Sequence, residues 1–178
     1  GMNTFFEENT LNIRSYYDNF GNPMVMINDS SCALAVNTKI GITLNLPPVY
    51  LDPRYKGKVL ICDTEGGAYG GIVKEQTIKS YVRQTGTFSI AIDTVAPVIG
   101  EPELKDGNIY VTISDELSGI SNYNAYINNT WYLMEYDPKT GTLKGDLKDY
   151  NKEPMLNFKL TVTDERNNTS TLSKKLKN

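Results

Sequence analysis

Residues 39–46 read Lys-Ile-Gly-Ile-Thr-Leu-Asn-Leu, and this stretch decides the fold class of the chain. Its apolar residues, Ile40, Ile42, Leu44 and Leu46, alternate with polar residues or glycine. Because successive side chains of a β-strand point to opposite faces, this period of two predicts a strand with one apolar face and one face toward water. No stretch carries the longer period of an amphipathic helix. We therefore expect an almost wholly β protein.

The same composition returns on both sides of that stretch. Segments rich in Val, Ile, Thr, Tyr and Phe are separated by turn residues, the pattern of many short antiparallel strands. In the first part of the chain we expect strands at 11–15, 23–27, 33–36, 40–46, 58–62, 68–73, 77–83 and 87–92. In the second part we expect them at 98–104, 108–114, 121–128, 130–136, 142–147, 156–163 and 169–175. One helical turn is expected at 51–56, where Pro53 suits the first turn.

The linker Asp93-Thr94-Val95-Ala96-Pro97 predicts a domain boundary, since a strand ends there and a proline interrupts pairing. We expect two tandem antiparallel β-sandwiches, residues 1–95, which are less regular, and residues 96–178. About seven strands in the second domain match an immunoglobulin or fibronectin type III sandwich, and a barrel is the alternative. Trp131, with Tyr132 and Leu133, is expected to fill the core of this domain.

Composition excludes several classes of function. The 178 residues contain no histidine, so we expect no histidine general base, no histidine-ligated zinc and no enzyme. The 18 basic and 21 acidic residues give a net charge of -3, which argues against a nucleic-acid partner. No apolar run approaches the roughly 20 residues of a membrane span. Residues 1–12 are acidic and polar and lack the pattern of an export signal.

A glycine-rich stretch, Gly66-Gly67 with Gly70-Gly71, invites a comparison with phosphate-binding loops. Such a loop leads into a helix N-terminus and usually carries a Lys-Ser/Thr pair. Here the strand-like sequence Ile-Val-Lys-Glu-Gln-Thr-Ile follows instead. We therefore expect a turn or a bulge between strands, and no phosphate site.

Several motifs stand in a recognisable order. They are residues 42–46, 56–61, 66–67, 81–90 and 93–97 in the first part and 113–120, 131–137, 160–164 and 167–170 in the second. Across about residues 38–175 this order resembles the C-terminal, non-catalytic region of exported lysostaphin-type zinc metallopeptidases of Bacteroidota and their stand-alone relatives. Residues 2–37 depart from that pattern.

The resemblance implies an exported, non-catalytic binding or positioning module in the periplasm or at the cell surface. The family's zinc is held by two histidines and an aspartate in a separate domain, and none of those motifs can be placed here. The implied partner is a cell-wall or surface glycan, or another protein domain. The alternative is a stand-alone cell-surface adhesion or glycan-binding protein.

Acidic residues at three predicted loops offer a candidate calcium site. If the second domain follows the sandwich order, the loops at 115–116 and 164–165 lie at the same end as the linker. Calcium takes six to eight oxygen ligands. The candidate ligands are Asp93, Asp115, Glu116, Asp164 and Glu165. The alternative is that these are turn residues that cap their own backbone. No other cofactor is expected.

Aromatic and sulfur-containing residues supply two further candidates. Four tyrosines of the second domain are candidates for an exposed strip that stacks against a glycan or peptide, although strand alternation sends about half of them into the core: Tyr123, Tyr126, Tyr132 and Tyr136. Cys32 and Cys62 lie in the first domain. They form either a disulfide, which export would permit, or two buried thiols.

Overall fold

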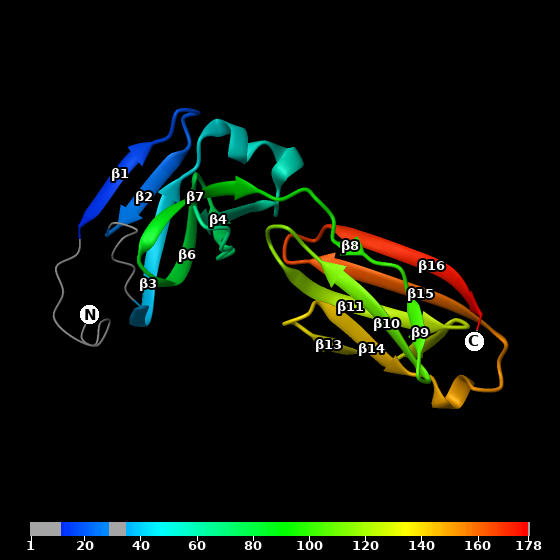
Figure 1. Cartoon of the computed structure of the whole chain (residues 1–178). Helices are drawn as coiled ribbons and strands as arrows, with labels where there is room; N and C mark the ends of the chain where they lie inside the picture. Colours follow the sequence, from blue (N-terminus) through cyan, green and yellow to red (C-terminus); the bar gives the residue numbers. More distant parts are fainter. Residues whose placement is uncertain (1–11, 29–34, 178) are drawn as a thin grey trace. The chain divides into compact units, whose positions relative to one another are not determined.

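A computed structural model of the chain describes residues 12–28 and 35–177 (Figure 1). The prediction of an all-β protein is confirmed, because the strands pair antiparallel in several sheets and the described helical segments are short 3-10 turns. None of the described helical segments is long and apolar enough to cross a membrane. The chain divides into two compact units, residues 1–94 and 95–178, one residue before the expected boundary.

The described residues of the first unit form two sheets. One sheet contains, in spatial order, β1 (Ile13–Tyr17), β2 (Pro23–Ile27), β7 (Gly86–Ile92) and β4 (Val59–Asp63). The other contains β3 (Ala35–Asn45), β6 (Thr77–Gln84) and β5 (Ile72–Lys74). The two strands expected at 33–36 and 40–46 form the single strand β3 over its described length, with a register shift between Ala35 and Ile40.

The core of the first unit follows from the alternation along its strands. Ile42 and Leu44 on β3 are buried, as the opening stretch predicts, and so are Phe88 and Ile90 on β7. Both sheets contribute to one hydrophobic cluster. The expected helical turn is confirmed as η3 (Pro53–Tyr55), which follows η2 (Pro48–Leu51) and begins with proline.

The glycine-rich stretch is a turn held by a carboxylate. Asp63 Oδ1 accepts the backbone N–H of Gly67 at 2.7 Å, while Asp63 Oδ2 accepts the Tyr69 hydroxyl at 2.5 Å and the Gln84 amide at 3.0 Å. Gly66 has a φ of 93°, a conformation that glycine adopts without strain. β5 follows the stretch, so the prediction of a turn between strands is confirmed.

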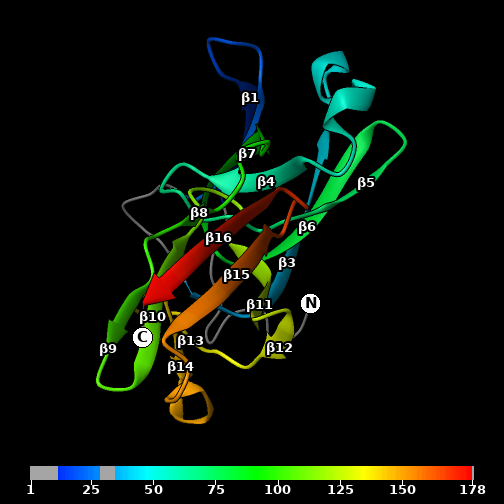
Figure 2. The ribbon, with the colours of Figure 1, turned by 90° about the vertical axis from the view of Figure 1, so that its right-hand side faces the viewer.

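The second unit also has two sheets. One contains β13 (Glu135–Asp137), β14 (Thr142–Asp146), β10 (Asn108–Ser114) and β8 (Val98–Ile99), with β9 (Glu103–Lys105) also paired to β10. The other contains β12 (Thr130–Tyr132), β11 (Ile120–Ile127), β15 (Met155–Asp164) and β16 (Thr169–Lys177). Figure 2 shows β15 and β16 side by side, in keeping with their continuous pairing from Met155 to Thr163. A short turn, η4 (Lys148–Tyr150), follows β14.

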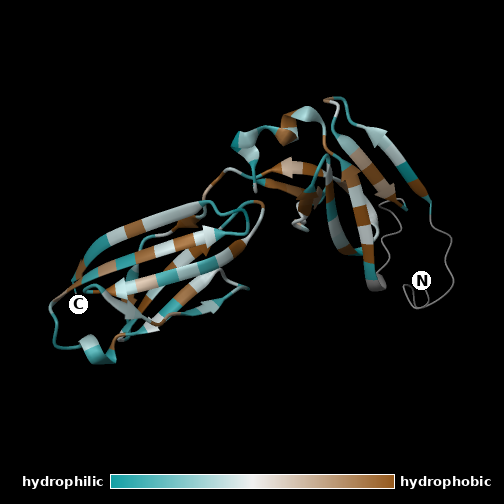
Figure 3. Cartoon of the chain, turned by 180° about the vertical axis from the view of Figure 1, so that it is seen from behind, coloured by the Kyte–Doolittle hydropathy of each residue, from teal (hydrophilic) through white to brown (hydrophobic). Residues whose placement is uncertain are grey.

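Alternation builds the core of the second unit. Along β15, Leu156, Phe158, Leu160 and Val162 are buried, and the residues between them are more exposed. Figure 3 shows this as alternating hydrophobic and hydrophilic bands along the strands. Residues of both sheets join in one hydrophobic cluster. The strand predicted at 130–136 is divided, because the chain leaves β12 in one sheet and enters β13 in the other.

Candidate functional site

Trp131 is an exposed aromatic residue of the second unit. Trp131 exposes 58% of its surface and Leu133 exposes 64%, whereas Tyr132 between them exposes 8%. The prediction that all three fill the core is therefore wrong for Trp131 and Leu133. The physical reason is strand alternation, which places Tyr132 and Met134 inward and their neighbours outward.

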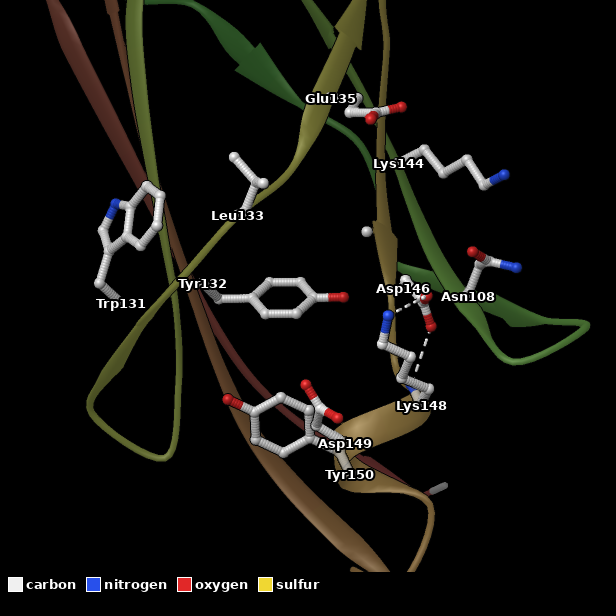
Figure 4. Close-up of a pocket in the computed structure, with 11 residues that line it drawn as sticks. Asn108, Trp131, Tyr132, Leu133, Glu135, Lys144, Asp146, Lys148, Asp149 and Tyr150 are labelled. Atoms are coloured by element: carbon white, nitrogen blue, oxygen red, sulfur yellow. Dashed lines mark hydrogen bonds and ion pairs between the residues drawn. The ribbon is translucent and has the colours of Figure 1, made fainter.

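A pocket of about 500 Å³ lies where the chain passes from β12 to β13. It is here called the Trp131 pocket (Figure 4). Its lining residues come from β10, β12, β13, β14, η4 and the residues that join them: Asn108, Trp131, Tyr132, Leu133, Glu135, Lys144, Gly145, Asp146, Lys148, Asp149 and Tyr150. Its volume falls in the range of small-molecule sites, roughly 300–1,000 Å³.

Two small residues and one aromatic ring fix the position of the Tyr132 ring in the pocket. Gly145 leaves room for it, since a Cβ there would lie 2.5 Å from Tyr132 Cε1 and 2.7 Å from Cζ. Tyr132 stands opposite the small Ala125 in the pairing of β11 with β12. The Tyr150 ring packs edge-on against it, with centroids 5.8 Å apart and an interplanar angle of 82°. These contacts hold the ring in one orientation.

The Tyr132 hydroxyl is buried, and among the described residues it has no hydrogen-bond partner. Figure 4 shows its hydroxyl end directed toward Asp146 and Lys148, away from Trp131 and Leu133. Buried polar groups are hydrogen-bonded in the large majority of cases, so an unpaired hydroxyl in a pocket is an exception that requires an explanation.

The pocket is lined by both acidic and basic residues, in similar numbers. Lys148 pairs with Asp146 at 3.6 Å. Lys144 Nζ lies 5.9 Å from the centroid of the Tyr110 ring, a cation–π distance. The side-chain carboxylates of Glu135 and Asp149 make no hydrogen bond or ion pair within the part of the chain that the structure describes, so they are available as acceptors. The pocket thus joins exposed apolar surface to several hydrogen-bonding groups.

Burial raises the pKa of Tyr132 above its ordinary value of 10.0, and the charge of Asp146 adds to the effect. The folded protein therefore favours the protonated hydroxyl. Below about pH 10 the hydroxyl is protonated in the folded and the unfolded states alike, so it adds no pH dependence, and above that pH the stability falls as the pH rises toward the folded-state pKa. We expect the free energy of unfolding in urea to fall more steeply above about pH 10 in the wild type than in Tyr132→Phe. Equal slopes in the two proteins would show that Tyr132 does not titrate as described.

The other tyrosines of the predicted strip are half-buried. Tyr123 donates its hydroxyl to the Met134 carbonyl at 3.1 Å, and its ring lies 6.0 Å from that of Tyr136. Both rings pack against the core. Tyr126 stands opposite Trp131 in the pairing of β11 with β12. A strip of four exposed rings is therefore not formed, because Tyr132 is buried and the rings of Tyr123 and Tyr136 pack against the core.

The acidic loops of the second unit hold their own turns. Asp115 Oδ1 accepts the backbone N–H groups of Leu117 and Gly119. Asp164 is buried and accepts the backbone N–H of Asn168 at 2.8 Å and its side-chain amide at 2.7 Å. These are the contacts of residues that cap their own backbone. They account for both aspartates without a bound ion.

The calcium site stays a prediction. Asp115 and Asp164 carry carboxylate oxygens within 4.8 Å of each other. Glu116 and Glu165 are exposed. Asp93 belongs to the first unit, where its backbone N–H donates to the Lys58 carbonyl at 2.9 Å. Two carboxylates with satisfied turn contacts are not by themselves a cation site.

The predicted disulfide is also untested. Cys32 lies outside the described residues. Cys62 is half-buried on β4, and its thiol lies 4.0 Å from the Ser89 carbonyl oxygen. Burial raises the pKa of the Cys62 thiol, and the charge of Asp63 raises it further. A thiol with a raised pKa is a poor nucleophile at neutral pH.

Comparison with known proteins gives no functional assignment. No protein-family model matches the chain, and no curated protein matches it. The geometry of the Trp131 pocket is therefore the principal basis for a functional proposal.

Proposed function

We propose that the chain is a non-catalytic glycan-binding module whose ligand is held in the Trp131 pocket. In this proposal each unit is a β-sandwich, and the second has an immunoglobulin-like arrangement. The observation that carries the proposal is the exposure of Trp131 and Leu133 on the rim of a pocket whose other walls carry hydrogen-bonding groups.

This combination suits the chemistry of sugars. A pyranose ring has a flat face of C–H groups that packs against an aromatic ring, and its edge is lined with hydroxyls. Trp131 offers a large apolar surface for the face. Glu135, Asp149 and Asn108 offer acceptors and donors for the edge. An exposed apolar residue beside such groups is typical of a ligand-binding groove.

The place of action follows from the resemblance to accessory regions of cell-wall peptidases. We propose that the module is exported, and that binding to a cell-wall or surface glycan positions a catalytic partner or anchors a stand-alone protein. Binding to another protein domain is the competing proposal. An exposed tryptophan is common to both kinds of interface, but the unpaired carboxylates of the pocket favour a ligand rich in hydroxyl groups.

A titration with oligosaccharides tests the proposed function. Trp131 is the single tryptophan of the chain, so intrinsic tryptophan fluorescence reports on this site alone. We expect cellotriose, chitotriose or soluble peptidoglycan fragments to change that emission saturably. Binding measured by calorimetry without any change in emission would place the glycan elsewhere.

A digestion assay tests the non-catalytic part of the proposal. Incubation with purified peptidoglycan, with and without added zinc, is expected to release no muropeptides, because the chain lacks histidine. Release that depends on the chain and is absent from a heat-inactivated control would contradict the proposal.

A further inference from the structure

We infer that the Tyr132 hydroxyl determines the specificity of the Trp131 pocket. It forms a hydrogen bond with a hydroxyl or amide group on the edge of the bound sugar that enters the pocket, here called the inner edge. The inference rests on the proposed function and deepens it. It assigns to one buried atom the recognition of a polar group on the ligand, while Trp131 supplies the apolar contact.

Without a ligand, the Tyr132 hydroxyl is an unsatisfied hydrogen-bonding group. It is buried and has no partner among the described residues, although Tyr132 as a whole exposes only 8% of its surface. Phenylalanine would fill the same volume without burying an unpaired polar atom. An unpaired buried hydroxyl destabilises the fold, because it has lost its hydrogen bonds to water and gained none.

The Tyr132 hydroxyl cannot rotate out of the pocket. Gly145 and Tyr150 confine the ring, so the oxygen stays at one end of the pocket. A fixed ring presents its hydroxyl at a defined position before the ligand arrives. A hydrogen bond made there costs little side-chain entropy, which is the physical basis of preorganised recognition.

A ligand has to pass exposed side chains to reach the Tyr132 hydroxyl. The side chain of Lys148 is 72% exposed and that of Asp146 is 58% exposed, and Figure 4 shows this pair at the hydroxyl end of the Tyr132 ring. An exposed ion pair is weakly held. We expect a ligand that displaces these exposed side chains to reach the oxygen.

The chemistry of the hydroxyl determines which groups of a ligand it can bind. A tyrosine hydroxyl both donates and accepts, so it pairs with a hydroxyl or an amide and not with an apolar ring edge. A site with a buried hydrogen-bonding group discriminates strongly against an analogue that lacks the matching group. The pocket is therefore expected to favour a sugar with a polar substituent at its inner edge over the corresponding deoxy sugar.

The test compares two tyrosine-to-phenylalanine variants of the full chain, with cellotriose and chitotriose as probes. Tyr132→Phe is expected to raise the melting temperature by about 4 °C, because it removes the unpaired hydroxyl, and to weaken binding about tenfold. Tyr123→Phe is the matched control, since its hydroxyl is already paired with Met134. It is expected to lower the melting temperature and to leave the affinity unchanged.

The outcomes separate the inference from the proposed function. Weaker binding by Tyr132→Phe with a melting temperature that is unchanged or higher supports the inference. Unchanged affinity of Tyr132→Phe, when Trp131→Ala weakens binding, overturns the inference alone. Absence of binding to both sugars by the wild type overturns the proposed function and the inference with it.

Discussion

Replacing Trp131 by alanine is expected to weaken glycan binding at least tenfold. The indole is the largest exposed aromatic surface on the pocket rim, and it exposes 58% of its area to solvent. Tryptophan side chains at the centre of an interface commonly contribute about 2 kcal/mol or more to binding, and 1.4 kcal/mol corresponds to a tenfold change. Calorimetry with cellotriose and chitotriose measures the effect, since the variant has no tryptophan emission.

The fold is expected to tolerate this change. Trp131 lies on the exposed side of its strand, so its removal creates no core cavity and is expected to alter the free energy of unfolding by less than about 1 kcal/mol. Tyr81→Ala is the matched control, because Tyr81 is an exposed aromatic residue on a strand of the first unit. Equal loss of affinity in both variants would contradict a site at Trp131.

The second large effect is expected from Gly145→Ala. Gly145 does not have a positive φ, so alanine suits its backbone. Its new methyl group would, however, lie 2.5 Å from Tyr132 Cε1, closer than real Cβ contacts. Overpacking of this kind typically costs about 1–3 kcal/mol. We expect urea unfolding to show that loss, and calorimetry to show weaker glycan binding because the Tyr132 ring is displaced.

Two comparisons isolate the steric cause. Gly41→Ala on β3 places its methyl group 3.5 Å from the Tyr81 ring, an ordinary contact, and is expected to be neutral or stabilising. In a Tyr132→Leu background, Gly145→Ala is expected to lose most of its effect, because the clashing ring atoms are gone. A full effect of Gly145→Ala in that background would mean that Tyr132 is not the obstacle.

Much of the fold is predictable from period-two alternation. β2 and β10 have the expected boundaries, and the buried positions of β3 and β15 follow from their apolar residues. Alternation does not predict which face of a strand points inward where both faces carry apolar residues. Residues 131–136 read Trp-Tyr-Leu-Met-Glu-Tyr, so hydrophobicity alone does not indicate which set points inward. Long-range packing against Ala125 and Gly145 decides it.

The pocket was harder to predict than the strands. Its walls come from residues that are distant in sequence, such as Asn108 and Asp149, and the break between β12 and β13 has no proline or glycine to mark it. One signal was available: Gly145 within a strand indicates close approach of another group, which here is the Tyr132 ring. The alternative role of the acidic turns, as caps of their own backbone, agrees with the hydrogen bonds of Asp115 and Asp164, and the calcium site stays a prediction.

We propose that a glycan binds in the second unit, at the Trp131 pocket. A two-dimensional ¹⁵N–¹H NMR titration of the full chain tests it most directly, because the single indole N–H signal belongs to Trp131. With chitotriose or cellotriose, we expect the indole signal and the Gly145 amide signal to shift along the same saturation curve. Saturable shifts confined to other residues, with the indole signal unmoved, would contradict the claim.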